Sequence, residues 1–110
     1  MHVTQVNLAK DFSAFPFGRF VTHGPASGER FRDEYLIPAM REGRAVEVDL
    51  KGARGLGPSF LEEAFGGLVR TGFSPVEIRR LITIRSEDDP SYIDEVWSYV
   101  DDAAKALVAH

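Results

Sequence analysis

The order of strand-like and helix-like segments predicts an α/β domain, in which helices pack on a sheet. Apolar and polar residues alternate over residues 45–50, whereas apolar residues recur at helical spacing over residues 59–71, and such patterns take turns along the chain. Glycine and proline fall singly between the segments, without a linker or an internal repeat. Because 44% of the 110 residues are hydrophobic, we expect one domain over residues 1–110 with one core.

Two strands are expected near the N-terminus. Residues 2–8 alternate imperfectly between apolar and polar side chains and are assigned to the first strand. Residues 11–18 form a turn, and residues 20–23 a short second strand. If the first strand lies at the edge of the sheet, it could pair with its copy, so both a monomer and a homodimer remain open. Three phenylalanines are expected to anchor the turn: Phe12, Phe15 and Phe17.

An amphipathic helix is expected from Ser27 onward, with Ser27 as its N-cap, because apolar residues recur at helical spacing as far as Met40. Pro38 lacks an amide hydrogen and should kink or end this helix near Ile37. A strand over residues 45–50 and a loop over residues 51–58 follow.

The helix predicted over residues 59–71 must be deeply packed, since apolar residues cover much of its circumference. Gly66 and Gly67 each cost about 1 kcal/mol relative to alanine inside a helix. Their presence indicates that another backbone approaches closely at this point.

Three elements complete the chain. Residues 74–80 form a short helix with Ser74 as N-cap, and residues 81–85 form the fourth strand. Asp89 is expected to cap a last helix. We assign Trp97 to the core rather than to a ligand platform. The buried stripe of this last helix is expected to contain Ile93, Val96, Trp97, Val100, Ala104 and Leu107.

Composition excludes several classes of protein. The absence of cysteine excludes a disulfide framework, a thiolate zinc site and a cysteine nucleophile, and it fits a reducing cytoplasm. No apolar run approaches the roughly 20 residues of a membrane span, and the N-terminus lacks a signal sequence. The net charge is −4, with the acidic excess in residues 86–110 and basic residues interleaved with acidic ones elsewhere. We therefore expect a cytoplasmic protein that binds neither membrane nor nucleic acid.

Ser59 is the most informative position for function, because it follows a glycine-rich loop and precedes a buried helix. Ser59 and Glu62 fit a capping box, in which the serine only caps the helix. The functional alternative is that this helix start binds an anion or presents the hydroxyl for phosphorylation. A phosphate there would lie close to Glu62 and Glu63 and could act as a charge switch.

A second helix start, over residues 24–32, could also cradle an anion through Gly24, Ser27 and Gly28. No lysine follows Gly28, so a nucleotide P-loop is disfavoured. We favour a plain N-cap at Ser27.

Catalysis and metal binding have little support. His2, His23 and His110 are dispersed, and no carboxylates stand beside them at the spacing of metal ligands. Ser59, His23 and Asp49 could be written as a hydrolytic triad, but the chain lacks a nucleophile elbow. We expect a protein without cofactor or metal that is not an enzyme.

Three stretches carry a resemblance to a known family. Residues 24–32 (GPASGERFR), 46–49 (VEVD) and 59–68 (SFLEEAFGGL) resemble the bacterial STAS-like domains of unknown function, and the resemblance extends from about Val6 to Asp101. That family is similar to the STAS domains of anti-sigma factor antagonists. The resemblance implies a mixed sheet of about four strands, with helices packed mainly on one side.

In the antagonists, a serine at the start of the second helix is phosphorylated by a histidine-kinase-like ATPase, and phosphorylation releases that partner. By position this serine matches Ser59. The resemblance thus implies a non-catalytic, partner-switching module that docks a kinase-type ATPase. Expected partner-binding residues are Gly57, Pro58, Ser59, Glu62 and Glu63. The alternative from the residues themselves is a small anion- or nucleotide-binding domain, or a minor enzyme, that uses the glycine-rich helix starts.

Overall fold

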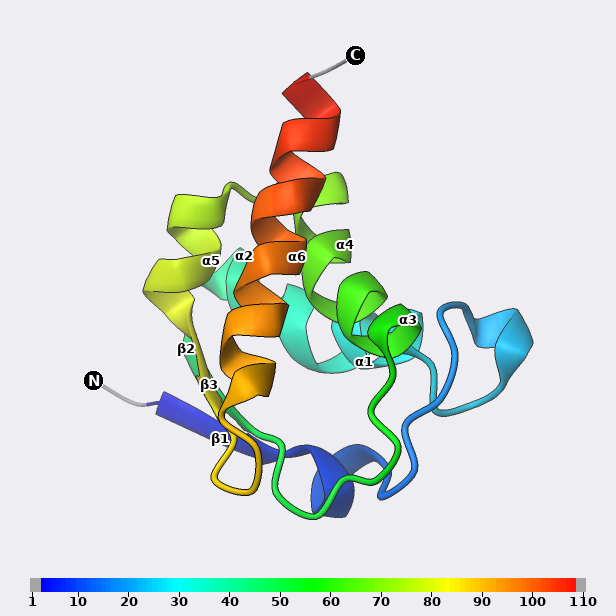
Figure 1. Cartoon of the computed structure of the whole chain (residues 1–110). Coiled ribbons are helices and arrows are strands. Elements are labelled where there is room, and N and C mark those ends of the chain that lie inside the picture. Colours follow the sequence, from blue (N-terminus) through cyan, green and yellow to red (C-terminus); the bar gives the residue numbers. More distant parts are fainter. Residues whose placement is uncertain (1–2, 109–110) are drawn as a thin grey trace.

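The computed structural model describes residues 3–108 and contains a parallel sheet with the strand order β1-β2-β3 (Figure 1). The strands are β1 (Val3–Asn7), β2 (Ala45–Asp49) and β3 (Ile82–Arg85). Both neighbouring pairs are parallel, as α/β crossover connections require. Three predicted strands are therefore confirmed, although His2 of the first one lies outside the described residues. β1 lies at one edge of the sheet, as pairing with a second copy would require. That pairing stays a prediction.

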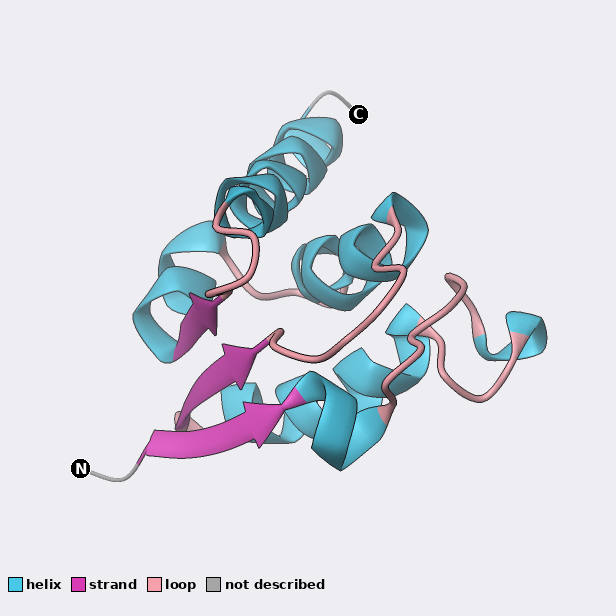
Figure 2. Cartoon of the chain, turned by 60° about the horizontal axis from the view of Figure 1, so that its bottom comes forward, coloured by secondary structure: helices cyan, strands magenta, loops and turns pink. Residues whose placement is uncertain are grey.

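The two faces of the sheet differ in burial. Val6, Val48 and Ile84 share one row across the strands and are buried. In the next row Gln5 and Thr83 are exposed and point to the opposite face. The helices pack on the apolar face, and Figure 2 shows them together on one side of the strands. The expected one-sided packing of helices is confirmed.

The expectation of a mixed sheet with about four strands is wrong for the described residues, where the sheet has three strands and is parallel throughout. The segment predicted as a strand at residues 20–23 forms a single 3-10 turn, η2 (Val21–His23). Gly18 and Gly24 on either side have positive φ, which curves the chain, and the His23 ring accepts hydrogen bonds from nearby amides that a sheet ladder would need.

The connection from β1 to β2 contains one long helix in three parts, α1 (Gly28–Phe31), η3 (Arg32–Leu36) and α2 (Ile37–Glu42). A π-helical turn separates the two α-helical parts, because the Ile37 amide donates to the Arg32 carbonyl five residues back. Pro38 follows this turn in the first turn of α2, and the helix does not end near Ile37 but continues to Glu42. A second π turn, η1 (Leu8–Phe12), follows β1 directly.

The connection from β2 to β3 contains a continuous helix made of α3 (Pro58–Leu61), η4 (Glu62–Gly66) and α4 (Gly67–Arg70), named below the 58–70 helix. It is followed by α5 (Pro75–Leu81), whose start carries the predicted Ser74 cap in a full capping box.

The last helix is α6 (Ser91–Val108), and the Ser91 amide donates to the Asp89 carboxylate at 3.1 Å, which confirms the predicted cap. Val96 and Val100 are buried as predicted, and Trp97 is half-buried with the Arg79 guanidinium 5.0 Å from its ring centroid. Leu107 is exposed, because this end of α6 extends beyond the core (Figure 1).

The described buried apolar residues form one core cluster. It contains phenylalanines of the helix over residues 28–42 and of the 58–70 helix. Phe31 lies 6.0 Å from Phe60 and 6.5 Å from Phe65, measured between ring centroids. Of the three predicted turn anchors, Phe12 packs 5.3 Å from Phe31, whereas Phe15 and Phe17 are 67% and 70% exposed. The expected anchoring by Phe15 and Phe17 is wrong, and these rings are available at the surface.

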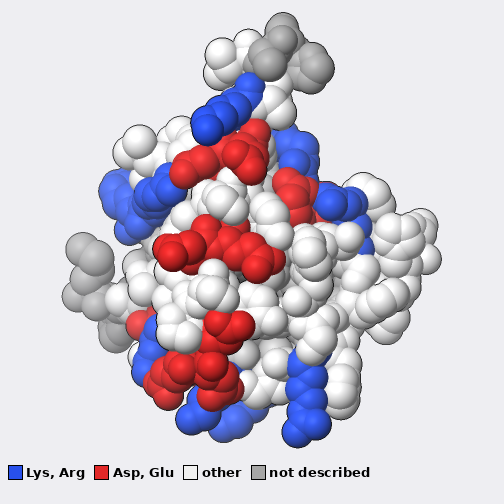
Figure 3. All heavy atoms as spheres, in the orientation of Figure 1, with Lys and Arg blue, Asp and Glu red and all other residues white. Residues whose placement is uncertain are grey.

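Acidic side chains gather over α6 and the turn before it, whereas the area toward the right-hand edge of the same face shows few charged side chains (Figure 3). This agrees with the acidic excess after residue 86. Within residues 3–108, no helix is long and apolar enough to span a membrane.

Candidate functional site

Ser59 occupies the second position of the 58–70 helix. The N-cap is Gly57, with extended backbone, and Pro58 takes the first helical position. The predicted capping box of Ser59 and Glu62 is therefore wrong, because the helix begins before Ser59 and the Glu62 carboxylate is bound elsewhere. Ser59 is exposed, and its hydroxyl has no hydrogen-bond partner among residues 3–108. The hydroxyl is thus free to contact a partner.

Glu62 and Glu63 belong to an arginine–glutamate cluster that joins three segments of the chain. The Arg70 guanidinium donates to both Glu62 oxygens at 2.9 Å and to Glu63 at 3.1 Å. Arg32 forms an ion pair with Glu63, and Arg19 donates to Glu62 and to Glu63. The Glu63 side chain is only 8% exposed, so the cluster holds a charge inside the protein. Its arginines neutralise carboxylates that would otherwise disfavour burial.

Two glycines make room for this cluster. A Cβ on Gly67 would lie 2.5 Å from the Arg32 guanidinium, and one on Gly66 would overlap the Glu62 carboxylate. The carbonyl oxygen of Tyr99 on α6 lies 3.2 Å from the same Gly66 position. The predicted close approach of another backbone is confirmed at Gly66, while at Gly67 the neighbour is a side chain.

The cluster shifts the pKa values of its members. Burial alone would raise the pKa of Glu62, but hydrogen bonds from Arg70 and Arg19 and their positive charges together hold this pKa below its ordinary value. The hydrogen bond to Glu62 raises the pKa of Arg19, and the pKa of Arg70 is raised mainly by the same carboxylate. All three groups are therefore charged at neutral pH.

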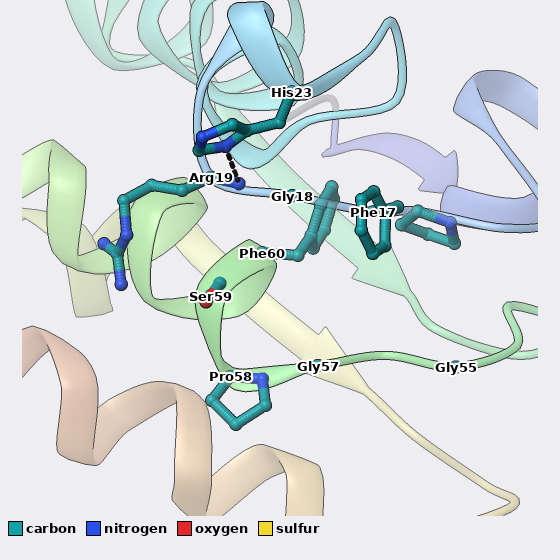
Figure 4. Close-up of a pocket in the computed structure, with 10 residues that line it drawn as sticks. Phe17, Gly18, Arg19, His23, Gly55, Gly57, Pro58, Ser59 and Phe60 are labelled. Atoms are coloured by element: carbon teal, nitrogen blue, oxygen red, sulfur yellow. Dashed lines mark hydrogen bonds between the residues drawn. The ribbon is translucent and has the colours of Figure 1, made fainter.

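Beside Ser59 lies a pocket of about 570 Å³. One wall is the segment from Pro16 to Arg19 together with His23, and the other runs from Gly55 and Gly57 into the start of the 58–70 helix (Figure 4). Phe60 lies between these walls. A volume of this size is typical of sites for small ligands or for a few side chains of a protein partner.

The first wall is held by a small hydrogen-bond network. The His23 Nδ1 atom accepts a hydrogen bond from the backbone amide of Arg19 at 3.3 Å (Figure 4). It also accepts one from the backbone amide of Phe20 at 3.1 Å. Gly18 has a φ of +88°, and a Cβ there would lie 2.8 Å from the His23 Cβ. The tight turn therefore fixes the direction of Arg19 toward the 58–70 helix.

The helix start at residues 24–32 is closed by internal bonds. Ser27 is buried and accepts from the Arg30 amide at 3.2 Å, which confirms it as N-cap. The amides of Gly28 and Glu29 donate to the carbonyls of Gly18 and Arg19, both at 2.9 Å. The amides of this first turn are thus already occupied within the protein and are not available to an anion at Gly24, Ser27 and Gly28.

The residues of the possible hydrolytic triad, Ser59, His23 and Asp49, do not all meet at the pocket. Asp49 accepts a hydrogen bond from the Lys51 amide and does not line the pocket that holds Ser59 and His23. His2 and His110 lie outside the described residues. Within residues 3–108 there is no group of three histidine or acidic residues that could hold a metal ion.

Sequence reasoning missed Phe17 and Arg19 as site residues. Phe17 lies in the predicted turn over residues 11–18 and Arg19 directly follows that turn, and both lie more than 35 residues before Ser59. A weak signal was present, because three phenylalanines lie within six residues of the segment predicted as one turn.

The protein is thus a small α/β domain with helices on one side of its sheet and an exposed serine beside a pocket at a helix start. The sequence model of the family described as "STAS-like domain of unknown function (DUF4325)" matches residues 27–92, so the chain belongs to this family. The match includes the 58–70 helix and the Ser59 wall of the pocket. No curated protein and no solved structure matches the chain.

Proposed function

We propose that the chain is a non-catalytic regulatory module whose protein partner docks at the Ser59 pocket. The observation that carries this proposal is the exposed, unbonded Ser59 hydroxyl beside a pocket with a largely exposed phenylalanine, Phe17. Exposed apolar side chains concentrate in the neighbouring segment, and such patches mark interaction sites. They are Phe15, Phe17, Phe20 and Val21.

We further propose that Ser59 is phosphorylated by a kinase-type ATPase partner, and that the phosphoryl group weakens the interaction. The second position of a helix favours an added anion, because free amides and the positive end of the helix dipole lie there. The carboxylates of Glu62 and Glu63, one turn further on, are already paired with arginines, which lowers their repulsion of a phosphoryl group.

The test is a pull-down of the tagged protein from its own cells in the presence of ATP, followed by the intact mass of the bait. We expect an ATPase in the eluate and bait with one phosphoryl group on Ser59. Ser59→Ala and Ser59→Glu should each change partner affinity by more than tenfold, about 1.4 kcal/mol. Ser98, exposed on α6 and away from the pocket, provides the control Ser98→Ala. Equal affinity of both Ser59 variants and wild type would remove Ser59 from the interface.

A second candidate function is binding of a small anion or nucleotide in the same pocket. The specific observation is that Arg19 and His23 line a pocket at a helix start. Inorganic phosphate and ATP should then raise the melting temperature of the wild type but not of Arg19→Gln. Equal melting temperatures with and without these ligands would eliminate this alternative.

A further inference from the structure

Arg19 belongs both to the arginine–glutamate cluster and to the pocket, and no other residue of the cluster does. Its side chain is 31% exposed, compared with 12% for Arg32. Arg70 is exposed too, but it does not line the pocket. Arg19 is therefore the member of the cluster that a docked partner can reach.

The cluster does not depend on Arg19 to neutralise its carboxylates. Both Glu62 oxygens also accept hydrogen bonds from Arg70. One Glu63 oxygen also accepts from Arg70 and the other from Arg32. If Arg19 turned away, each of the four oxygens would keep a charged donor, so no buried charge would lose its last partner.

The chemistry of the pocket defines what Arg19 would bind. Its lining contains no aspartate or glutamate, and its charged or titratable side chains are Arg19 and His23. Apolar surface next to them comes from two phenylalanines and two prolines, Pro16, Phe17, Pro58 and Phe60. A complementary partner segment carries a carboxylate next to a large apolar side chain.

We propose that Arg19 exchanges its cluster contacts for a carboxylate of a partner peptide segment, while a neighbouring aromatic or large apolar side chain of that segment packs against Phe17. This inference rests on the proposed function, since it names the chemistry of the partner at the same site. It also predicts an effect of Ser59: this residue lies three residues before Glu62, a spacing that places them on one helix face. A negative charge at Ser59 competes with the partner carboxylate for the Arg19 guanidinium and therefore weakens the binding of acidic partner segments.

The test is selection of binders from a displayed library of random 12-residue peptides on the full chain, followed by affinities from fluorescence anisotropy. We expect enrichment of peptides with Asp or Glu within two residues of Phe, Trp or Leu. Arg19→Gln should weaken the selected peptides by tenfold or more, and Ser59→Glu should weaken them also. Replacing the peptide carboxylate by an amide should weaken wild-type binding equally and have little further effect on Arg19→Gln.

The matched control is Arg30→Gln, because Arg30 is an exposed arginine that pairs with Glu34 and does not line the pocket. It should leave peptide affinity unchanged, and equal urea midpoints of the variants should exclude unfolding. No selected binders, selection without acidic enrichment, or equal affinity of wild type and Arg19→Gln would overturn the proposal. If the pull-down still yields a partner that depends on Ser59 but not on Arg19, this inference fails while the proposed function stands.

Discussion

Gly28 at the start of α1 lies directly against the backbone of Phe60 in the 58–70 helix. A Cβ on Gly28 would overlap the Phe60 carbonyl oxygen and would lie 3.1 Å from the Ala64 amide nitrogen. The helix over residues 28–42 and the 58–70 helix thus touch at Gly28, a position that admits no side chain. This contact also fixes the distance between the two walls of the pocket, since the amide of Gly28 is bonded to the Gly18 carbonyl.

Gly28→Ala should destabilise the protein by about 1–3 kcal/mol, the usual cost of overpacking. At an uncrowded site the same change would stabilise by about 0.4–1 kcal/mol, because alanine has less freedom in the unfolded chain. The sign of the change in the free energy of unfolding therefore shows whether Gly28 is packed tightly against the 58–70 helix. Urea unfolding measures it, with Gly57→Ser as control, because the nearest atom to a Cβ on Gly57 is 4.0 Å away. A stabilised Gly28→Ala variant would contradict the close packing.

Ser59→Ala should leave the free energy of unfolding within about 0.5 kcal/mol of wild type, because the Ser59 hydroxyl bonds to no described group. Ser27→Ala should cost about 1–2 kcal/mol, because Ser27 is buried and caps α1. Chemical denaturation of both variants tests the pair. A loss of about 1 kcal/mol in Ser59→Ala would restore the capping role that the sequence suggested.

Glu63→Gln should destabilise the protein by about 3 kcal/mol, because it leaves the poorly exposed Arg32 guanidinium without its main buried partner. Glu62→Gln should cost less, since the Glu62 side chain is 21% exposed. Urea unfolding at neutral pH compares the two. Combining Glu63→Gln with Arg32→Gln should cost less than the sum of the single changes, because neither then leaves an unpaired charge. Additive costs would show that the pair is not coupled.

The sequence predicted those features that depend on local patterns. Ser27 and Ser74 each stand directly before the first turn of a helix. Each hydroxyl accepts a hydrogen bond from a backbone amide three residues further on, at Arg30 and Glu77. The same reasoning could have placed the start of the 58–70 helix correctly. Gly57 followed by Pro58 is a common helix start, but the match of Ser59 and Glu62 to a capping box concealed it.

The site itself depends on contacts that no local pattern reports. Arg19 reaches Glu62 across 43 positions of sequence, and Arg32 reaches Glu63 across 31. The sequence assigned the two glutamates to a capping box and to partner binding, because the arginines that pair with them are scattered along the chain. The arginine–glutamate cluster was therefore not predictable, although the two glycines that make room for it were recognised as unusual.

Acid should destabilise the protein in part through Glu62. The pKa of Glu62 lies below its ordinary value of 4.5 in the folded protein, so the unfolded chain binds this proton more readily. The stability that the charged form contributes is complete above about pH 4.5 and is lost as the pH falls through the lower folded pKa. The free energy difference between wild type and Glu62→Gln should therefore shrink on acidification from pH 7 to about pH 3, measured by urea unfolding. A difference that stays constant or grows would show that the arginines do not stabilise the ionised Glu62.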